Sequence, residues 1–141
     1  MLYETFDSVR TLLNAIPQLK TVQWYNAQYE GTIYVSPVAF VEFPERIPLD
    51  QVAGSVCRAD FALRIHIVSA CAAAQDGSIA DNIIQEHEAI AVRVMDILQG
   101  RQIRIKESRS TSLVPSGWQH YHKYKGWMVT FVDFRATAIL G

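Results

Sequence analysis

The 141-residue sequence predicts a single α+β domain over residues 1–141, in which two helices pack on an antiparallel sheet of about four to five strands. Two segments carry apolar residues at helical spacing, and several others alternate between apolar and polar residues or are apolar throughout, as strands are. Consecutive strand segments are joined by short connections, which favour antiparallel neighbours. The expected order is helix, three strands, helix and two strands, with both helices on one face of the sheet.

The first helix is expected to end at Pro17, because proline cannot continue a helix. Its apolar residues recur at spacings of three and four: Leu2, Phe6, Val9, Leu13 and Ile16. The first strand is expected after Lys20, in "TVQWYNAQ", and "YEG" reads as the turn that follows it.

The second strand is expected from about Tyr34 to Phe43, with apolar residues on both parities and therefore with both faces covered. The segment "ERIPLDQVAGS" is predicted to be the longest loop, because it contains Pro48 and Gly54. The third strand, "RADFALRIHIV", alternates, so one face is expected to be buried and the other to be wetter. The wetter face would carry Asp60, Arg64 and His66.

The second helix is predicted to open in "DGSIADNII", where Ser78 and Asp81 resemble a capping box, and to end at Gly100. Its buried stripe is expected to comprise Ile83, Ile84, His87, Ile90, Ala91, Val94, Ile97 and Leu98. A short edge-type strand in "RQIRIKES", a polar, turn-rich segment "SRSTSLVPSGWQHYHKYKG" and a long apolar strand "WMVTFVDFRATAIL" complete the chain.

The composition excludes several classes of protein. Half of the residues are apolar and 19% are charged, which indicates a compact fold, and a net charge of -1 gives no global attraction to nucleic acid or to an anionic membrane. The N-terminus lacks the apolar core of a signal peptide, and no run reaches the roughly 18 apolar residues that a membrane helix needs. Cys57 and Cys71 form no disulfide pattern and fit reduced thiols in a cytosolic protein.

No motif assigns a catalytic, cofactor-binding or metal-binding residue. The seven glycines form neither of the phosphate-binding loops, and the serine-hydrolase elbow is absent. His66 and Cys71 are five positions apart, which places them on opposite sides of a strand. His120 and His122 in His120-Tyr121-His122 have a spacing that metals use, but no third ligand accompanies them at a telling spacing.

Two functional alternatives remain open at this level. His87 on the helix stripe reads either as a core-edge histidine or as the partner of Glu42 in an acid–base pair, with His66 as a further participant, in a small enzyme or ligand-binding domain. The second alternative is a weak nucleic-acid-binding module that uses aromatic and basic residues, although nucleic acid is not favoured as a partner. The residues concerned are Arg101, Arg104, Lys106, Arg109, Tyr121, Lys123, Tyr124, Lys125 and Trp127.

The apolar surplus of the sheet favours a third reading, an assembly protein. The second and the last strands are apolar on both parities, so with both helices on one face the other face would expose large side chains. A homo-oligomer would cover them. Glu42 and Asp133 would then be rim charges that meet Arg64 or Arg135 of a neighbouring copy. The interface candidates are Phe40, Glu42, Phe43, Arg64, Trp127, Phe131, Asp133 and Arg135.

The chain resembles the tail-terminator, or tail-completion, proteins of phages and prophages. The resemblance rests on "SPVAFVEFP", on the alternating "ADFALRIHIV", on the amphipathic helix that ends in "RVMDILQG", and on the closing "GWMVTFVDFRA". It covers nearly the whole chain and concerns the order of the elements and their apolar pattern, not a diagnostic motif. The aromatic, histidine-bearing "WQHYHKYKGW" departs from that pattern.

The resemblance implies a homo-oligomeric ring, commonly of six subunits, that caps the tail tube and joins it to the head or neck. It implies no catalytic residue and no cofactor, tail-tube and head-connector proteins as partners, and no membrane. The expected location is the virion, and the host bacterial cytoplasm during assembly. Residues 45–55 and 108–125 would be the natural places for contacts with neighbouring subunits or the tube.

Overall fold

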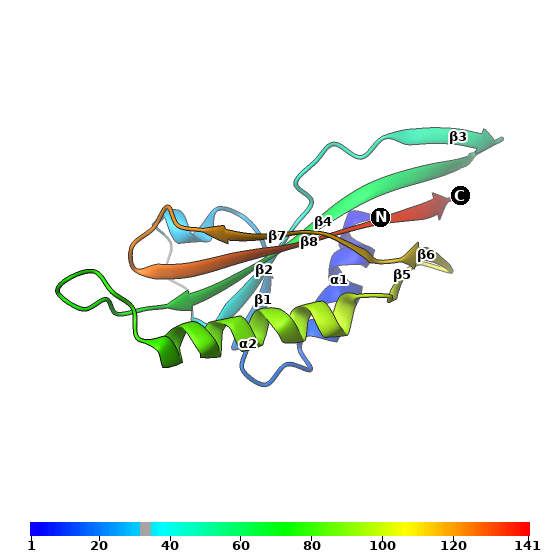
Figure 1. Ribbon diagram of the computed structural model, residues 1–141. Coiled ribbons are helices and arrows are strands. Elements are labelled where there is room, and N and C mark those ends of the chain that lie inside the picture. Colours follow the sequence, from blue (N-terminus) through cyan, green and yellow to red (C-terminus); the bar gives the residue numbers. More distant parts are fainter. Residues whose placement is uncertain (32–34) are drawn as a thin grey trace.

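The computed structural model describes residues 1–31 and 35–141 and confirms the α+β class (Figure 1). Its sheet has six strands, more than the four to five expected, in the order β1-β2-β4-β8-β7 with β3 also paired to β4, and β5 and β6 form a separate hairpin. The elements are α1 (Leu2–Leu13), β1 (Thr21–Trp24), η1 (Gln28–Glu30), β2 (Val38–Glu42), β3 (Leu49–Ala53), β4 (Val56–Ala70), α2 (Asp81–Leu98), β5 (Gln102–Ile105), β6 (Ser108–Ser112), β7 (Val114–Tyr121) and β8 (Trp127–Leu140).

The long antiparallel pair β4 and β8 forms the centre of the sheet, with a register that runs from Cys57 opposite Leu140 to Ala70 opposite Trp127. Because β4 is 15 residues long, two strands share its other edge: β2 pairs with residues 64–68 and β3 with residues 56–59. All pairings in the large sheet are antiparallel except that of β1 with β2. The antiparallel prediction is therefore wrong for this first pair.

Both helices pack on the same face of the sheet, as predicted, and we call it the helix face. Side chains of α1 and α2 join one core cluster with the inward residues of β2, β4 and β8. Phe61, Leu63, Ile65 and Ile67, which the alternation of the third strand assigned to one side, are all buried in it. This cluster is the main apolar core.

The opposite face is covered by the chain's own tyrosines, and we call it the tyrosine face. A second cluster on it contains Tyr29, Val38, Phe40, Val68, Val129 and Phe131, with Tyr25, Tyr121, Tyr124 and Trp127 packed against it. Phe40 is fully buried and Phe131 is 6% exposed. The expectation that this face exposes large side chains is therefore wrong. Tyr25 and Tyr29 follow β1, Tyr121 ends β7 and Tyr124 follows it, and these tyrosines cover the face.

Two segments predicted to lack regular structure contain strands. The expected loop of residues 45–55 includes β3, and the expected turn-rich segment after β5 includes β6 and β7. Both are polar, exposed edge or hairpin strands, which carry little of the apolar alternation that identifies a strand from sequence. The expected start of the second strand at Tyr34 lies outside the described residues, and β2 begins at Val38.

The second helix begins at Asp81 and has Ala80 at its N-cap, so the predicted capping box is wrong. The Ser78 hydroxyl instead donates to Asp76 Oδ1 at 2.6 Å, within the turn before the helix. At the other end Gly100 follows the helix with φ +79°, a left-handed conformation that favours glycine, as predicted. Within the described ranges, neither helix is long and apolar enough to span a membrane.

A hairpin projects from the body beyond the helices (Figure 1). We call it the arm, and it comprises β3 and residues 56–59 of β4. All five residues of β3 are exposed, including Leu49 at 59% and Val52 at 61%. The end of β8 runs along the arm, with Leu140 opposite Cys57, and the chain then reaches Gly141, which lies beside the Val56 side chain. The arm is thus the part of the sheet that the helices do not cover.

Candidate functional site

The strand register places seven of the eight interface candidates on the tyrosine face, and Phe43 packs against the helix-face core. Glu42, Arg64 and Asp133 lie in one row across β2, β4 and β8. The row beside it contains Phe40, His66 and Phe131. The sequence therefore grouped residues that are neighbours in space, although their role in an interface stays a prediction.

The charged candidates find partners within the same chain, where the sequence analysis expected a neighbouring copy. Arg64 pairs with Asp133, Glu42 with His66, and Arg135 with Glu45, at 2.9, 2.6 and 2.8 Å. The expectation that Glu42 and Asp133 await a cation from another subunit is therefore corrected. The register explains the difference, because it places Arg64 directly between the two carboxylates.

Arg64 and Asp133 form a bidentate pair. Arg64 Nε donates to Asp133 Oδ1 at 2.9 Å and an Nη donates to Oδ2 at 3.1 Å, while the guanidinium lies 4.5 Å from the ring centroid of Phe131. This hydrogen bonding to Asp133 raises the pKa of Arg64. Both side chains are about three-quarters buried, so water screens the pair less than an exposed pair. The pair acts as a brace across the two central strands.

Replacing Asp133 with alanine is expected to lower the free energy of unfolding by about 1–3 kcal/mol, because the largely buried Arg64 would keep its charge without its carboxylate. Urea unfolding of Asp133→Ala, Arg64→Ala and the double variant measures the coupling. If the two single effects simply add, the pair contributes no interaction energy and this reading of the brace fails.

Tyr29, His66 and Glu42 form a buried hydrogen-bonded chain. Tyr29 Oη lies 2.8 Å from His66 Nδ1, and His66 Nε2 lies 2.6 Å from Glu42 Oε1. Burial lowers the pKa of His66, although the hydrogen bond to Glu42 acts in the opposite direction, and burial also raises the pKa of Tyr29. A neutral imidazole therefore donates from Nε2 to the carboxylate and accepts the tyrosine hydroxyl at Nδ1.

The His66 ring of this hydrogen-bonded chain packs between two aromatic rings. The His66 ring stacks on Tyr25 at 4.2 Å and meets the edge of Phe131 at 4.5 Å between ring centroids. His66 is only 2% exposed, so the sequence prediction that it lies on a wetter face is wrong. Every polar atom of the imidazole is already bonded within the fold, which is how a buried polar side chain is usually accommodated.

His87 lies on the other side of the sheet from Glu42, so the alternative of an acid–base pair between them is excluded. Its Nδ1 lies 2.7 Å from Ser69 Oγ and its Nε2 lies 2.9 Å from Thr130 Oγ1, and both partners belong to the helix face. Burial, with a smaller effect of His120, lowers the pKa of His87 to about 4. His87 is therefore a histidine at the edge of the core with both ring nitrogens hydrogen-bonded, which is the first of the two interpretations of this residue given by the sequence.

A cavity of about 660 Å³ lies between the start of α2, β7 and the start of β8. We call it the aromatic cavity, because its walls include Ile84, Trp118, His120, His122, Tyr124 and Trp127. His120 and His122 lie 5.4 Å apart between ring centroids. No group of three or more histidine, cysteine or acidic residues in ranges 1–31 and 35–141 is arranged to hold a metal ion.

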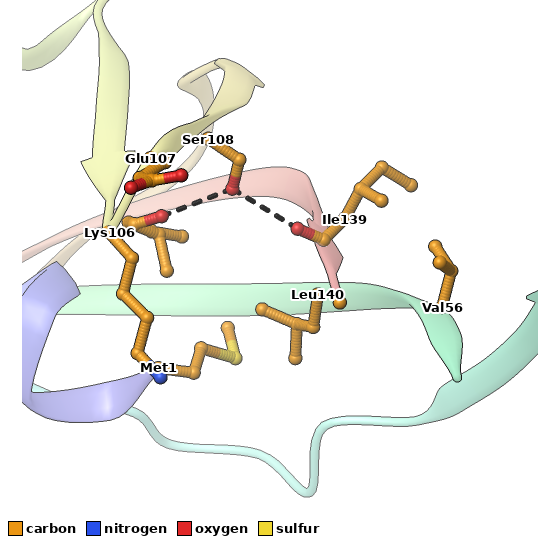
Figure 2. A pocket seen from close by; sticks show the side chains of 9 residues that line it. Met1, Val56, Lys106, Glu107, Ser108, Ile139 and Leu140 are labelled. Carbon is orange, nitrogen blue, oxygen red and sulfur yellow. Dashed lines mark hydrogen bonds between the residues drawn. The ribbon is translucent and has the colours of Figure 1, made fainter.

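A second hollow of about 600 Å³ lies where the arm joins the body (Figure 2). Met1, Val56, Ile139 and Leu140 form its apolar walls, and Ser108 lies at the edge. The Ser108 hydroxyl donates to the carbonyls of Ile105 and Ile139, which ties the β5–β6 hairpin to the end of β8. The hollow is therefore bordered by a fixed hairpin on one side and by the arm on the other.

Comparison of the sequence with protein-family models and with curated proteins finds no match. The fold is similar to that of a chain in a solved structure described as the virion of native gene transfer agent (GTA) particle, with a TM-score of 0.69 and 15% sequence identity. The likeness covers 96% of this chain and 95% of that chain. At this identity it establishes that the two chains share a fold over almost their whole lengths.

Proposed function

We propose that the protein is a structural component of a phage-like virion, where it acts as a tail terminator: a homo-oligomeric ring that caps the tail tube and joins it to the head or neck. The observation that carries this proposal is the full-length fold likeness to a chain of the gene transfer agent virion. The likeness covers 96% of this chain and 95% of that chain, so it concerns the fold as a whole and not one part of it. The partners would be tail-tube and connector proteins, and the site of action the virion.

The internal chemistry supports a structural role. The two histidines that could act in catalysis, His66 and His87, have both ring nitrogens bonded to side chains of the fold. The arm, in contrast, exposes apolar side chains away from the body, as a contact element does.

The proposal predicts that the purified protein forms one closed oligomer. Size exclusion with light scattering and native mass spectrometry should give a single species whose mass is an integral multiple of 15.9 kDa, with six copies expected. Dilution should not produce a ladder of intermediate sizes, because a closed ring satisfies every contact surface. A strict monomer at high protein concentration would overturn the ring.

A further inference from the structure

We propose that neighbouring copies join by strand addition: β3 of one copy pairs antiparallel with the outer edge of β7 in the next, so that Leu49 enters the aromatic cavity. This inference rests on the proposed ring and names the surfaces that build it. The occupant of the aromatic cavity is thus a second copy of this chain, contributed by the arm.

The donor is the arm. β3 pairs with β4 on one side, and no other strand of the described residues pairs with its outer edge. All five β3 residues are exposed, with Leu49 and Val52 the most apolar. A strand with an open edge and exposed apolar side chains is a template for pairing with another chain. Its one acidic residue, Asp50, is already paired with Arg58 in the arm at 3.4 Å.

The acceptor is the second half of β7. β7 is the terminal strand on the opposite side of the sheet, and within ranges 1–31 and 35–141 no strand lies beyond it. Pro115 and the irregular register between Pro115 and Gly117 make its first half a poor partner, since proline has no N–H to donate. Residues 118–121 remain, and they contain no aspartate, glutamate, lysine or arginine that would oppose an arriving strand.

The aromatic cavity borders this half of β7. Trp118 and His120 line it from the strand, and Trp118, 43% exposed, is opposite the helix-face residue Val132 in the register. His87 also lines the cavity and has both nitrogens bonded to Ser69 and Thr130. Glu88 and Lys125 are the charged residues of the lining, and its apolar walls, which include Ile84, Trp127 and Met128, suit an apolar side chain.

The sheet topology makes the two edges compatible. β3, β4, β8 and β7 are successive antiparallel neighbours, so β3 and β7 run in opposite directions. A copy placed beside the sheet with its helix face on the same side therefore brings β3 antiparallel to β7. Leu49 lies opposite Ala59, which has the same strand parity as Phe61 and Leu63 of the helix-face core, so it would point to the side of the sheet where the cavity opens.

The contact joins two different surfaces, and each copy carries both. Such a head-to-tail contact continues from copy to copy and gives a ring when the rotation between copies closes, whereas a contact between identical surfaces stops at a dimer. The location of the two edges on opposite sides of one sheet is therefore the structural reason that this chain would form rings.

A mixing experiment tests the direction of the contact. The donor variant carries Leu49→Asp and Val52→Asp, and the acceptor variant carries Trp118→Glu, all at positions that are at least 43% exposed. Each variant alone should be a monomer. An equimolar mixture should give a one-to-one heterodimer and nothing larger, because only one productive pair of surfaces remains. Val92→Glu, at an equally exposed position on α2, is the matched control and should keep the oligomer.

Native mass spectrometry measures the assembly state of each variant and of the mixture, and circular dichroism shows whether the variants are folded. If the wild type is a ring but the folded variants remain rings, or if their mixture contains no heterodimer, the strand-addition contact is wrong while the proposed function stands. If the wild type is itself a monomer, the proposed function fails. As a second measurement that leaves the apolar contact residues intact, Asp50→Cys mixed with Gln119→Cys, both with Cys57→Ser and Cys71→Ser, should cross-link through a short bismaleimide, because both positions have the tyrosine-face parity. Asp50→Cys mixed with Val92→Cys should not, and failure of the first pair to cross-link would overturn the contact.

Discussion

Replacing Phe40 with alanine is expected to lower the free energy of unfolding by about 3–5 kcal/mol, the cost typical of removing a buried phenylalanine side chain. Phe40 is fully buried on β2, and its ring centroid lies 6.2 Å from that of Tyr25 and 6.1 Å from that of Tyr29. The substitution would leave a cavity beneath the tyrosines, which can collapse only partly because β2 is held between β1 and β4. Urea unfolding measured by tryptophan fluorescence gives the change.

Phe40 was predicted from sequence to lie in an interface. The size of the loss of unfolding free energy in Phe40→Ala, and its dependence on protein concentration, distinguish an interface residue from a core residue. A core residue lowers stability at every protein concentration, whereas an interface residue acts through assembly. Val52→Ala in the exposed arm is the control, and in the unassembled protein its effect should remain within about 0.5 kcal/mol. A change below about 1 kcal/mol for Phe40→Ala in the monomer would contradict the covered tyrosine face.

The second large effect is expected on acidification. The pKa of His87 is lowered from 6.5 to about 4 in the folded protein, so the unfolded chain binds a proton more readily than the folded one. Stability from this group is present above pH 6.5 and is lost as the pH falls towards 4. A shift of that size corresponds to a loss of about 3 kcal/mol at pH 4. Burial lowers the pKa of His66 as well, which acts in the same direction.

The variant His87→Gln isolates the contribution of His87. Glutamine can bond to Ser69 and Thr130 but does not titrate, so the difference in unfolding free energy between wild type and variant should shrink or reverse in favour of the variant between pH 7 and pH 4. Urea unfolding at half-unit pH steps measures it. Parallel curves for the two proteins over this range would show that His87 titrates normally and is not buried as described.

The residue pattern predicted the elements that bury a continuous apolar stripe. The first helix, the alternating strand β4, the final strand β8 and the exit of α2 at Gly100 were all predicted because their patterns repeat over many residues. The strands β3, β6 and β7 were missed, because a polar strand at an edge or in a hairpin looks like a loop in sequence. The parallel pairing of β1 with β2 was missed for a different reason, since pairing direction depends on the path of the connection between them.

The candidate site was predicted in part. The parity of β4 placed Arg64 and His66 on one face, and both lie on the tyrosine face. What each side chain meets depends on the register between β2, β4 and β8, which no short pattern encodes. The pairing of Glu42 with His66 could not be read from two residues that are 24 positions apart. The covering tyrosines had no apolar periodicity to reveal them, because three belong to connections and Tyr121 ends the largely polar strand β7.

By itself, the amino-acid sequence determined the α+β class and a sheet that is apolar on both faces, since each helix and strand carries its burial pattern in its own residues. Only the tertiary structure decided what covers the second face. This face is covered by Tyr25 and Tyr29, which follow β1, and by Tyr121 and Tyr124, at the end of β7 and just beyond it. The two pairs are far apart in the sequence and pack over the same strands. The tertiary structure also shows that the exposed apolar side chains lie on the arm and on the edge strand β7, and not on the tyrosine face. The sequence of a strand does not reveal this, because a strand becomes an edge only through the arrangement of the whole sheet.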